Sequence, residues 1–161
     1  MSRPEQYVSF LLAGEEYAVG ILRTREIVEY DVITRIPMAP PGIRGVLNLR
    51  GRVIPVLDLA EKLGLPKTEP TRFTCILMVE VAFEAEPMLI GMLIDAVSEV
   101  IDLSPGDIEP PPRFGIRVRL DYLAGIGKVG KKIVLLLDID RILSPDELLA
   151  TAKVVPELTA G

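Results

Sequence analysis

Apolar and polar residues alternate near the start of the chain, and this pattern predicts a β-hairpin. Val8, Phe10 and Leu12 alternate with more polar neighbours, and the alternation resumes over residues 17–21 after a turn at Gly14 and Glu15. A period of two residues puts alternate side chains on one face of a strand. We therefore expect one face of this hairpin to be buried.

Further apolar runs predict more strands. Bounded by turn-forming residues, such runs are typical of strands. They cover residues 46–49, 53–57, 74–83, 88–94 and 133–137. The more polar residues 22–29 are expected to form either a short helical turn or a bent strand, and the proline-containing stretches 33–41 and 105–115 are expected to be loops.

Two short sequences have the composition of a helix N-terminus. Asp58 is followed three residues later by Glu61, and Gly64 suits the position after a last helical turn, so residues 59–63 are expected to form a short helix. Ser144 followed by Pro, Asp and Glu147 also has the pattern of a helix start, which predicts a C-terminal helix running to about Lys153.

Composition favours a β-rich domain and excludes several kinds of chemistry. The 161 residues include 14 Pro and 13 Gly, aromatic residues make up only 5%, and the apolar material is mainly Val, Ile and Leu. Histidine is absent, which excludes histidine-dependent catalysis and most zinc sites. The net charge of −5, without a basic run, argues against nucleic acid binding. The single cysteine, Cys75, is expected to be an inert core residue.

A weak internal repeat divides the chain. Residues 45–64 align without gaps with residues 125–144, and residues 18–28 align with residues 91–101, which places Glu26 on Glu99. The offset changes from 73 to 80 between the two blocks, so the second copy contains about seven extra residues. Each copy has roughly five short strands, so we expect two small β-barrels packed together.

Arg50 distinguishes the two copies. It lies between two predicted strands, followed by Gly51, whereas the aligned position in the second copy is Gly130. An ion pair needed only for the architecture should be present in both copies, so an arginine in only one copy suggests that Arg50 has a task specific to the first copy, such as binding a partner. The alternative is a surface arginine or a local ion pair with Glu26, and these residues alone leave both interpretations open.

Several segments, in order and spacing, resemble the CheW family of chemotaxis coupling proteins. They are GEEYAV at 14–19, REI at 25–27, TRIPMAP at 34–40, GVLNLRGRVIPVLDL at 45–59, GMLIDAVSEV at 91–100 and LLLDIDRIL at 135–143. The resemblance extends over about residues 7–150, nearly the whole chain. It implies a mainly β fold of two five-stranded SH3-like barrels, with short helices and a C-terminal helix.

The resemblance also implies a function and its residues. CheW-like domains are non-enzymatic adaptors that link the cytoplasmic tips of chemoreceptors to the regulatory domain of the histidine kinase CheA, and other CheW-like domains are a further kind of partner. Glu26 and Arg50 match the family's receptor-coupling pair. Its receptor groove lies between the barrels, which adds as candidates Gly45, Val46, Asn48, Gly91, Val97 and Gly125.

The resemblance also sets the expected domain organisation. One CheW-like domain is expected at 7–153, divided into a first barrel at about 20–72 and a second at about 73–143, with the chain ends packing back and a tail at 154–161. No cofactor, metal or catalytic residue is expected. Because residues 1–10 lack a signal-peptide stretch and no run is long enough to span a membrane, the chain is expected to be cytoplasmic and recruited to receptor arrays, without membrane insertion.

Two other classes of function remain as alternatives. An enzyme would have to use acids such as Asp58, Asp95, Asp138 or Asp140, but turn and cap roles explain the recurring pair Asp58 and Asp138 better. The glycines at 125, 127 and 130 fit GxGxxG, yet a strand follows them where a phosphate loop would need a helix, so this string is expected to be a turn. A small-ligand sensor is the other alternative, although no residues mark a pocket for it.

Overall fold

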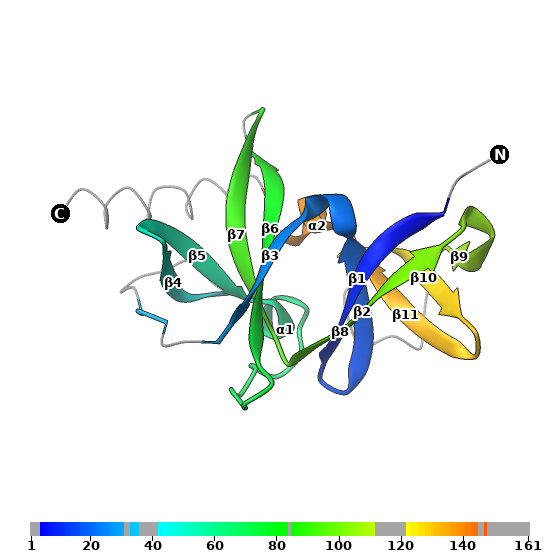
Figure 1. Cartoon of the computed structure of the whole chain (residues 1–161), viewed down its shortest axis with the longest axis horizontal. Coiled ribbons are helices and arrows are strands. Elements are labelled where there is room, and N and C mark those ends of the chain that lie inside the picture. The colour runs from blue at the N-terminus through cyan, green and yellow to red at the C-terminus, as the bar shows by residue number, and fades with distance from the viewer. Residues whose placement is uncertain are drawn as a thin grey trace.

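The chain folds into two β-sheets that lie side by side along the long axis of the molecule (Figure 1). The computed structural model describes residues 4–30, 33–35, 42–83, 85–111, 122–144 and 147. A five-stranded sheet has the order β3-β6-β7-β5-β4, and a six-stranded sheet has the order β8-β1-β2-β11-β10-β9. A mainly β fold with two sheets is thus confirmed, and the strand orders are consistent with two SH3-like barrels.

Most strands coincide with the predicted hairpin and apolar runs, but the strands at 96–103, 108–109 and 123–129 lie outside those runs. The five-stranded sheet contains β3 (Thr24–Glu29), β4 (Ile43–Leu49), β5 (Arg52–Asp58), β6 (Cys75–Phe83) and β7 (Glu86–Ile94). The six-stranded sheet contains β1 (Glu5–Leu12), β2 (Glu15–Gly20), β8 (Ala96–Leu103), β9 (Ile108–Glu109), β10 (Leu123–Val129) and β11 (Lys132–Leu137). Residues 22–29 combine both expected forms, because the single turn η1 (Ile21–Arg23) leads directly into β3.

The repeat is visible in the strand pairing, but the two copies exchange a hairpin. Val56 of β5 pairs in parallel with Gly91 of β7, and the aligned residue Leu136 of β11 pairs in parallel with Ala18 of β2. Hence β6 and β7 complete the sheet of the first copy, whereas β1 and β2 complete the sheet of the second. The expected division at about 72/73 is therefore wrong as a sheet boundary, because it assigned β6 and β7 to the second barrel.

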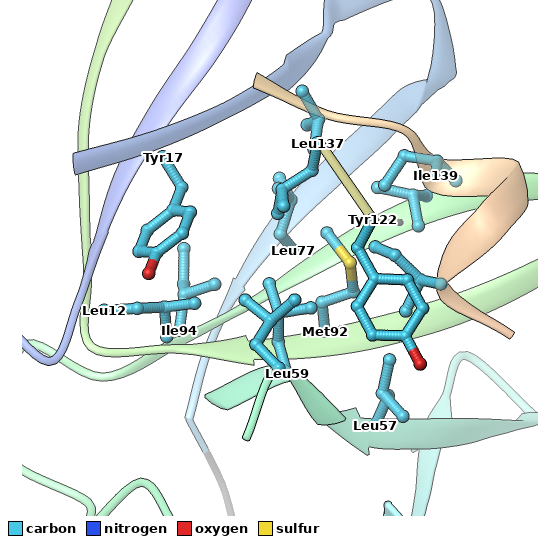
Figure 2. Packing of buried hydrophobic residues seen from close by; sticks show 14 of the residues in the cluster. Leu12, Tyr17, Leu57, Leu59, Leu77, Met92, Ile94, Tyr122, Leu137 and Ile139 are labelled. Carbon is cyan, nitrogen blue, oxygen red and sulfur yellow. The ribbon is translucent and has the colours of Figure 1, made fainter. Parts of the chain in front are cut away.

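Three apolar clusters hold the sheets together. The largest lies between them and takes residues from both sheets and from the short helices, among them Tyr17, Leu57, Met92 and Leu137 (Figure 2). A smaller cluster packs within each sheet: one is built around Ile54, Ile76 and Met78, and the other around Ala18, Ile101 and Val134.

The first hairpin is more deeply buried than its alternation predicts. Phe10 and Tyr17 face the central cluster, with their rings stacked at 6.2 Å between centroids. Ser9 and Ala18, on the other face, are also fully buried. The predicted buried face is thus confirmed, but part of the other face is buried as well, because small residues there pack within the six-stranded sheet.

The short helix predicted after Asp58 is present, and an equivalent helix that the sequence did not predict follows Asp138. At α1 (Leu59–Lys62), the Asp58 carboxylate accepts a hydrogen bond from the backbone N–H of Glu61 at 3.1 Å. The equivalent α2 (Ile139–Ile142) is capped by Asp138 in the same way, through Asp140 N–H. Ser144 and Glu147 form the reciprocal bonds of a capping box. The remainder of the expected C-terminal helix, and the tail at 154–161, lie outside the described residues.

The structure departs from the predicted loop at 105–115 and from the predicted turn at 125–130, and it describes only part of the predicted loop at 33–41. The stretch 105–115 begins with the single turn η2 (Pro105–Asp107) and the short strand β9, so it is not irregular throughout. Of the stretch 33–41, residues 36–41 lie outside the described residues. The string 125–130 lies on β10 and reaches its turn only at Gly130, so the expectation of a turn is wrong for most of it. Among the described residues, no helix is both long and apolar enough to cross a membrane.

Candidate functional site

Arg50 lies in the tight turn between β4 and β5. Arg50 and Gly51 both have positive φ values, 51° and 86°, as a two-residue turn of type I′ requires. The Asn48 side-chain oxygen accepts a hydrogen bond from Gly51 N–H at 3.0 Å and braces the turn. Asn or Gly is the usual residue at such a position, so the arginine is unfavourable for the turn itself. Its side chain therefore needs an explanation outside the backbone conformation.

The guanidinium of Arg50 forms a two-pronged ion pair with Glu26 of β3. Nη1 donates to Oε1 at 3.0 Å, and Nη2 donates to Oε2 at 2.7 Å. These hydrogen bonds lower the pKa of Glu26 and raise the pKa of Arg50. The Arg50 side chain remains 70% exposed and that of Glu26 37%. An exposed pair contributes little to stability, but this geometry holds the guanidinium in one orientation toward solvent.

This ion pair also links the two outer strands of the five-stranded sheet. β3 and β4 stand at opposite ends of the strand order, yet Glu26 of β3 contacts Arg50 at the end of β4. Farther along, Thr34 and Val46 exchange backbone hydrogen bonds at 3.0 and 2.8 Å. The sheet is therefore curled, and the Arg50–Glu26 pair closes it at one end.

A depression of about 490 Å³ lies beside this pair, and we call it the Arg50 depression. Its floor is apolar and includes the buried Ile54 and Met78. Its charged rim carries a second ion pair, between Arg25 and Glu80. The full lining is Arg25, Glu26, Leu49, Arg50, Arg52, Ile54, Met78, Glu80, Pro87 and Leu89. An apolar floor with fixed charges at its rim suits the amphipathic surface of a helix.

The candidate residues from the sequence do not share one surface. Glu26, Arg50 and Asn48 lie together, as just described. Gly45 and Val46 are buried in β4, where a Cβ added to Gly45 would lie 2.3 Å from the Thr34 carbonyl oxygen.

The other candidates are farther along the fold. Gly91 is buried in β7, where a Cβ would lie 2.7 Å from Ile76 Cγ2. Val97 of β8 and Gly125 of β10 belong to the six-stranded sheet. Val97 is 39% exposed, and Gly125 packs against Ile108. The glycines thus serve close packing within the sheets, while the Arg50 depression is lined by strands of the five-stranded sheet alone.

The second copy contains a variant of the ion pair that the sequence comparison missed. Glu99, aligned with Glu26, lies 3.6 Å from the Lys132 ammonium, which also contacts Glu16 at 3.1 Å. In the repeat Lys132 aligns with Arg52, whereas Arg50 aligns with Gly130. A comparison of positions 50 and 130 alone therefore does not reveal the ion pair of Lys132. The argument that only the first copy pairs its glutamate is therefore wrong. What distinguishes the first copy is the two-pronged guanidinium contact.

The acids considered for catalysis have structural partners. Besides capping α1, Asp58 is fully buried and accepts a hydrogen bond from Arg44 Nη1 at 2.8 Å. Asp95 accepts from the backbone N–H of Ala13 at 2.9 Å, and Asp140 is paired with Arg23. The part of the chain that the structure describes contains no cluster of three or more Cys, Asp or Glu side chains placed to hold a metal ion.

Comparison with known proteins gives a consistent result over nearly the whole chain. Residues 6–147 match the family model described as CheW-like domain. The chain is 33% identical over 144 residues to the chemotaxis protein CheW of Klebsiella aerogenes, covering 89% of this chain and 84% of that protein. It is 35% identical over 142 residues to CheW of Helicobacter pylori, covering 88% and 82%. The crystal structure of the scaffolding protein TtCheW from Thermoanaerobacter tengcongensis superposes with a TM-score of 0.79 at 32% identity, covering 91% and 92%.

Proposed function

The chain belongs to the CheW family of chemotaxis scaffold proteins, and from this premise we propose that it couples chemoreceptors to the histidine kinase CheA without catalysing a reaction. In this role it is a cytoplasmic adaptor that is recruited to receptor arrays. Its partners are the helical tip of a chemoreceptor and the regulatory domain of CheA, with other CheW-like domains as a third kind of partner.

One observation supports the receptor role most directly. Arg50 occupies a turn position that disfavours arginine, and Glu26 fixes its guanidinium beside the apolar floor of the Arg50 depression. A side chain already held in place loses less conformational entropy on binding than a free one. The tip of a chemoreceptor is a helical hairpin, whose amphipathic surface would place apolar residues on this floor and polar residues near Arg50.

The kinase is proposed to use a different surface. Val100 and Ile133 are exposed apolar residues of the six-stranded sheet, and they are 53% and 60% exposed. Neither of them lines the Arg50 depression. The two partners would then bind at once, as an adaptor requires.

The test measures both interactions in one set of variants. A soluble helical-hairpin fragment of a cognate chemoreceptor and the cognate CheA regulatory domain are titrated separately against wild type, Arg50→Glu and Lys131→Glu. Lys131 lies in the equivalent turn of the six-stranded sheet, so the control has the same change in charge. We expect Arg50→Glu to weaken receptor binding at least tenfold and to leave kinase binding within twofold. Absence of wild-type binding to both fragments at high micromolar concentration would overturn the proposed function.

A further inference from the structure

Arg52 is the one arginine of the Arg50 depression without an ion-pair partner among the described residues. Arg25 is paired with Glu80, and Arg50 is paired with Glu26. Arg52 is exposed and lines the same depression, but its guanidinium contacts no carboxylate of the described residues. Among the residues that the structure describes, the depression is therefore lined by three arginines and two glutamates, and one of the three positive charges has no ion-pair partner.

The position of Arg52 directs this charge toward the apolar floor. Arg52 is the first residue of β5 after the turn and pairs with Leu49, the last residue of β4. Because side chains alternate along a strand, Arg52 lies on the same face as Ile54, which is buried in the sheet's own cluster. The cation thus stands at the outer end of an apolar row, one strand position beyond the floor of the depression.

The second copy shows that this cation need not be free. Lys132, which aligns with Arg52, lies between Glu16 and Glu99 and is neutralised by them. The six-stranded sheet therefore has no equivalent uncompensated charge at this strand position. The free guanidinium is a property of the first copy, where the Arg50 depression is found.

Charge complementarity identifies the kind of group that Arg52 would bind. The whole chain has a net charge of −5, so its surface on average repels acidic partners. The lining of the Arg50 depression reverses this locally, with three arginines against two glutamates. A carboxylate can accept two parallel hydrogen bonds from one guanidinium, which gives both affinity and orientation.

We propose that Arg52 binds an acidic side chain of the receptor helix that occupies the Arg50 depression, and thereby helps to select which receptors are bound. This inference rests on the proposed function of the same site. The acidic residue lies three or four positions from the apolar residue that enters the depression, because residues at that spacing share one face of a helix. Arg50 is already paired with Glu26 and serves as a fixed part of the site. Arg52 then contacts the carboxylate of the receptor helix.

The experiment compares Arg52→Gln, Arg52→Glu and the control Lys131→Glu for binding to the receptor hairpin fragment at several salt concentrations. We expect about a fivefold loss for Arg52→Gln, at least a twentyfold loss for Arg52→Glu and no more than a twofold change for the control. Arg52→Gln should also reduce the salt dependence of binding, because one charge contact is lost. Changing the acidic residues of the fragment to Arg one at a time should restore binding to Arg52→Glu at a single position.

The outcomes separate this inference from the proposed function. If wild type binds the fragment and Arg50→Glu does not, but both Arg52 variants bind within twofold of wild type, the role of Arg52 is wrong and the receptor site stands. If Arg52→Glu instead weakens only binding to the CheA regulatory domain, the assigned occupant is wrong. If wild type does not bind the receptor fragment at all, the receptor role itself fails, and this inference fails with it. Circular dichroism and thermal unfolding of each variant exclude loss of the fold as the cause.

Discussion

Ala18 of β2 pairs in parallel with Leu136 of β11, so a strand from the first copy of the repeat completes the sheet of the second. The reverse exchange places Gly91 of β7 beside Val56 of β5. Each sheet is therefore made from both copies, and neither copy can complete its own sheet alone. The large apolar cluster between the sheets adds to this dependence, so we expect the described part of the chain to unfold as one cooperative unit.

Gly45 tests whether the close approach of Thr34 to β4 stabilises the curled sheet. A Cβ at position 45 would lie 2.3 Å from the Thr34 carbonyl oxygen, so Gly45→Ala must displace backbone. Overpacking of this kind should lower the free energy of unfolding by about 3 kcal/mol. The aligned Gly125→Ala, with its nearest contact at 3.0 Å, should cost about 1 kcal/mol. Urea unfolding measures both.

Gly106→Ala is the control for this pair of variants. A Cβ at Gly106 would have no heavy atom within 4 Å, so its free energy of unfolding should stay within about 0.5 kcal/mol of wild type. A Gly45→Ala protein as stable as the control would show that Thr34 and β4 do not approach as closely as described.

Arg44 and Arg141 provide a matched comparison of a buried and an exposed ion pair. Each is paired with an aspartate that caps a short helix, Arg44 with Asp58 at the start of α1 and Arg141 with Asp138 at the start of α2. The Asp58 side chain is fully buried, whereas Arg141 is 67% exposed. Removing the partner of a buried charge costs more than removing the partner of an exposed one.

We therefore expect Arg44→Met to lower the free energy of unfolding by about 3 kcal/mol. Arg141→Met should lower it by less than about 1 kcal/mol. Arg44 also donates to the Thr68 carbonyl at 3.0 Å, so its loss should increase hydrogen exchange in the 66–74 connector. Equal losses of stability for the two variants would contradict the assigned burial of Asp58.

Tyr17 should make stability depend on pH in the alkaline range. Burial, with a smaller contribution from Glu15, raises the pKa of Tyr17 to about 12. Between about pH 10 and pH 12 the unfolded chain loses this proton while the folded chain keeps it, so unfolding becomes more favourable as the pH rises. Below about pH 10 the contribution is complete. The loss across this interval is at most about 3 kcal/mol.

Tyr17→Phe keeps the ring beside Phe10 but has no proton to lose. Lysines and the other tyrosines also titrate in this range, so the relevant quantity is the difference between wild type and variant. Guanidinium unfolding at pH 9 and pH 11.5 should show a steeper loss for wild type. Parallel losses in both proteins would show that Tyr17 ionises equally easily in the folded and unfolded states.

Local elements of this fold could be predicted from the sequence, and the assignment of strands to sheets could not. The β4–β5 hairpin follows from two apolar runs and the turn at Arg50 and Gly51, because its partners are neighbours along the chain. The hairpin exchange depends on contacts between Ala18 and Leu136, which no local pattern encodes. The two offsets of the repeat, 73 and 80 residues, recur in the equivalent strand pairs. The repeat therefore shows that the two sheets are equivalent, but not which copy completes which sheet.

The candidate site shows a similar limit. Glu26 and Arg50 could be identified from the repeat and the family resemblance, and the structure brings them together. Arg52 was missed, because a sequence does not distinguish an arginine with a partner from one without. The family resemblance places the glycines at 45, 91 and 125 in a receptor groove, whereas their contacts in the structure show a role in close packing, which glycine at these positions would also suggest.

A double-mutant cycle of Arg50 and Glu26 determines how the pair acts in receptor binding. If Glu26 serves only to orient Arg50, Glu26→Gln should weaken binding of the receptor fragment about threefold, and Arg50→Gln about tenfold. In the Arg50→Gln background, Glu26→Gln should then have no further effect, because the side chain that it orients is absent. Both single variants should retain the wild-type fold, since the pair is exposed. Losses that multiply in the double variant would instead indicate that each residue contacts the receptor independently, and the orienting role of Glu26 would be wrong.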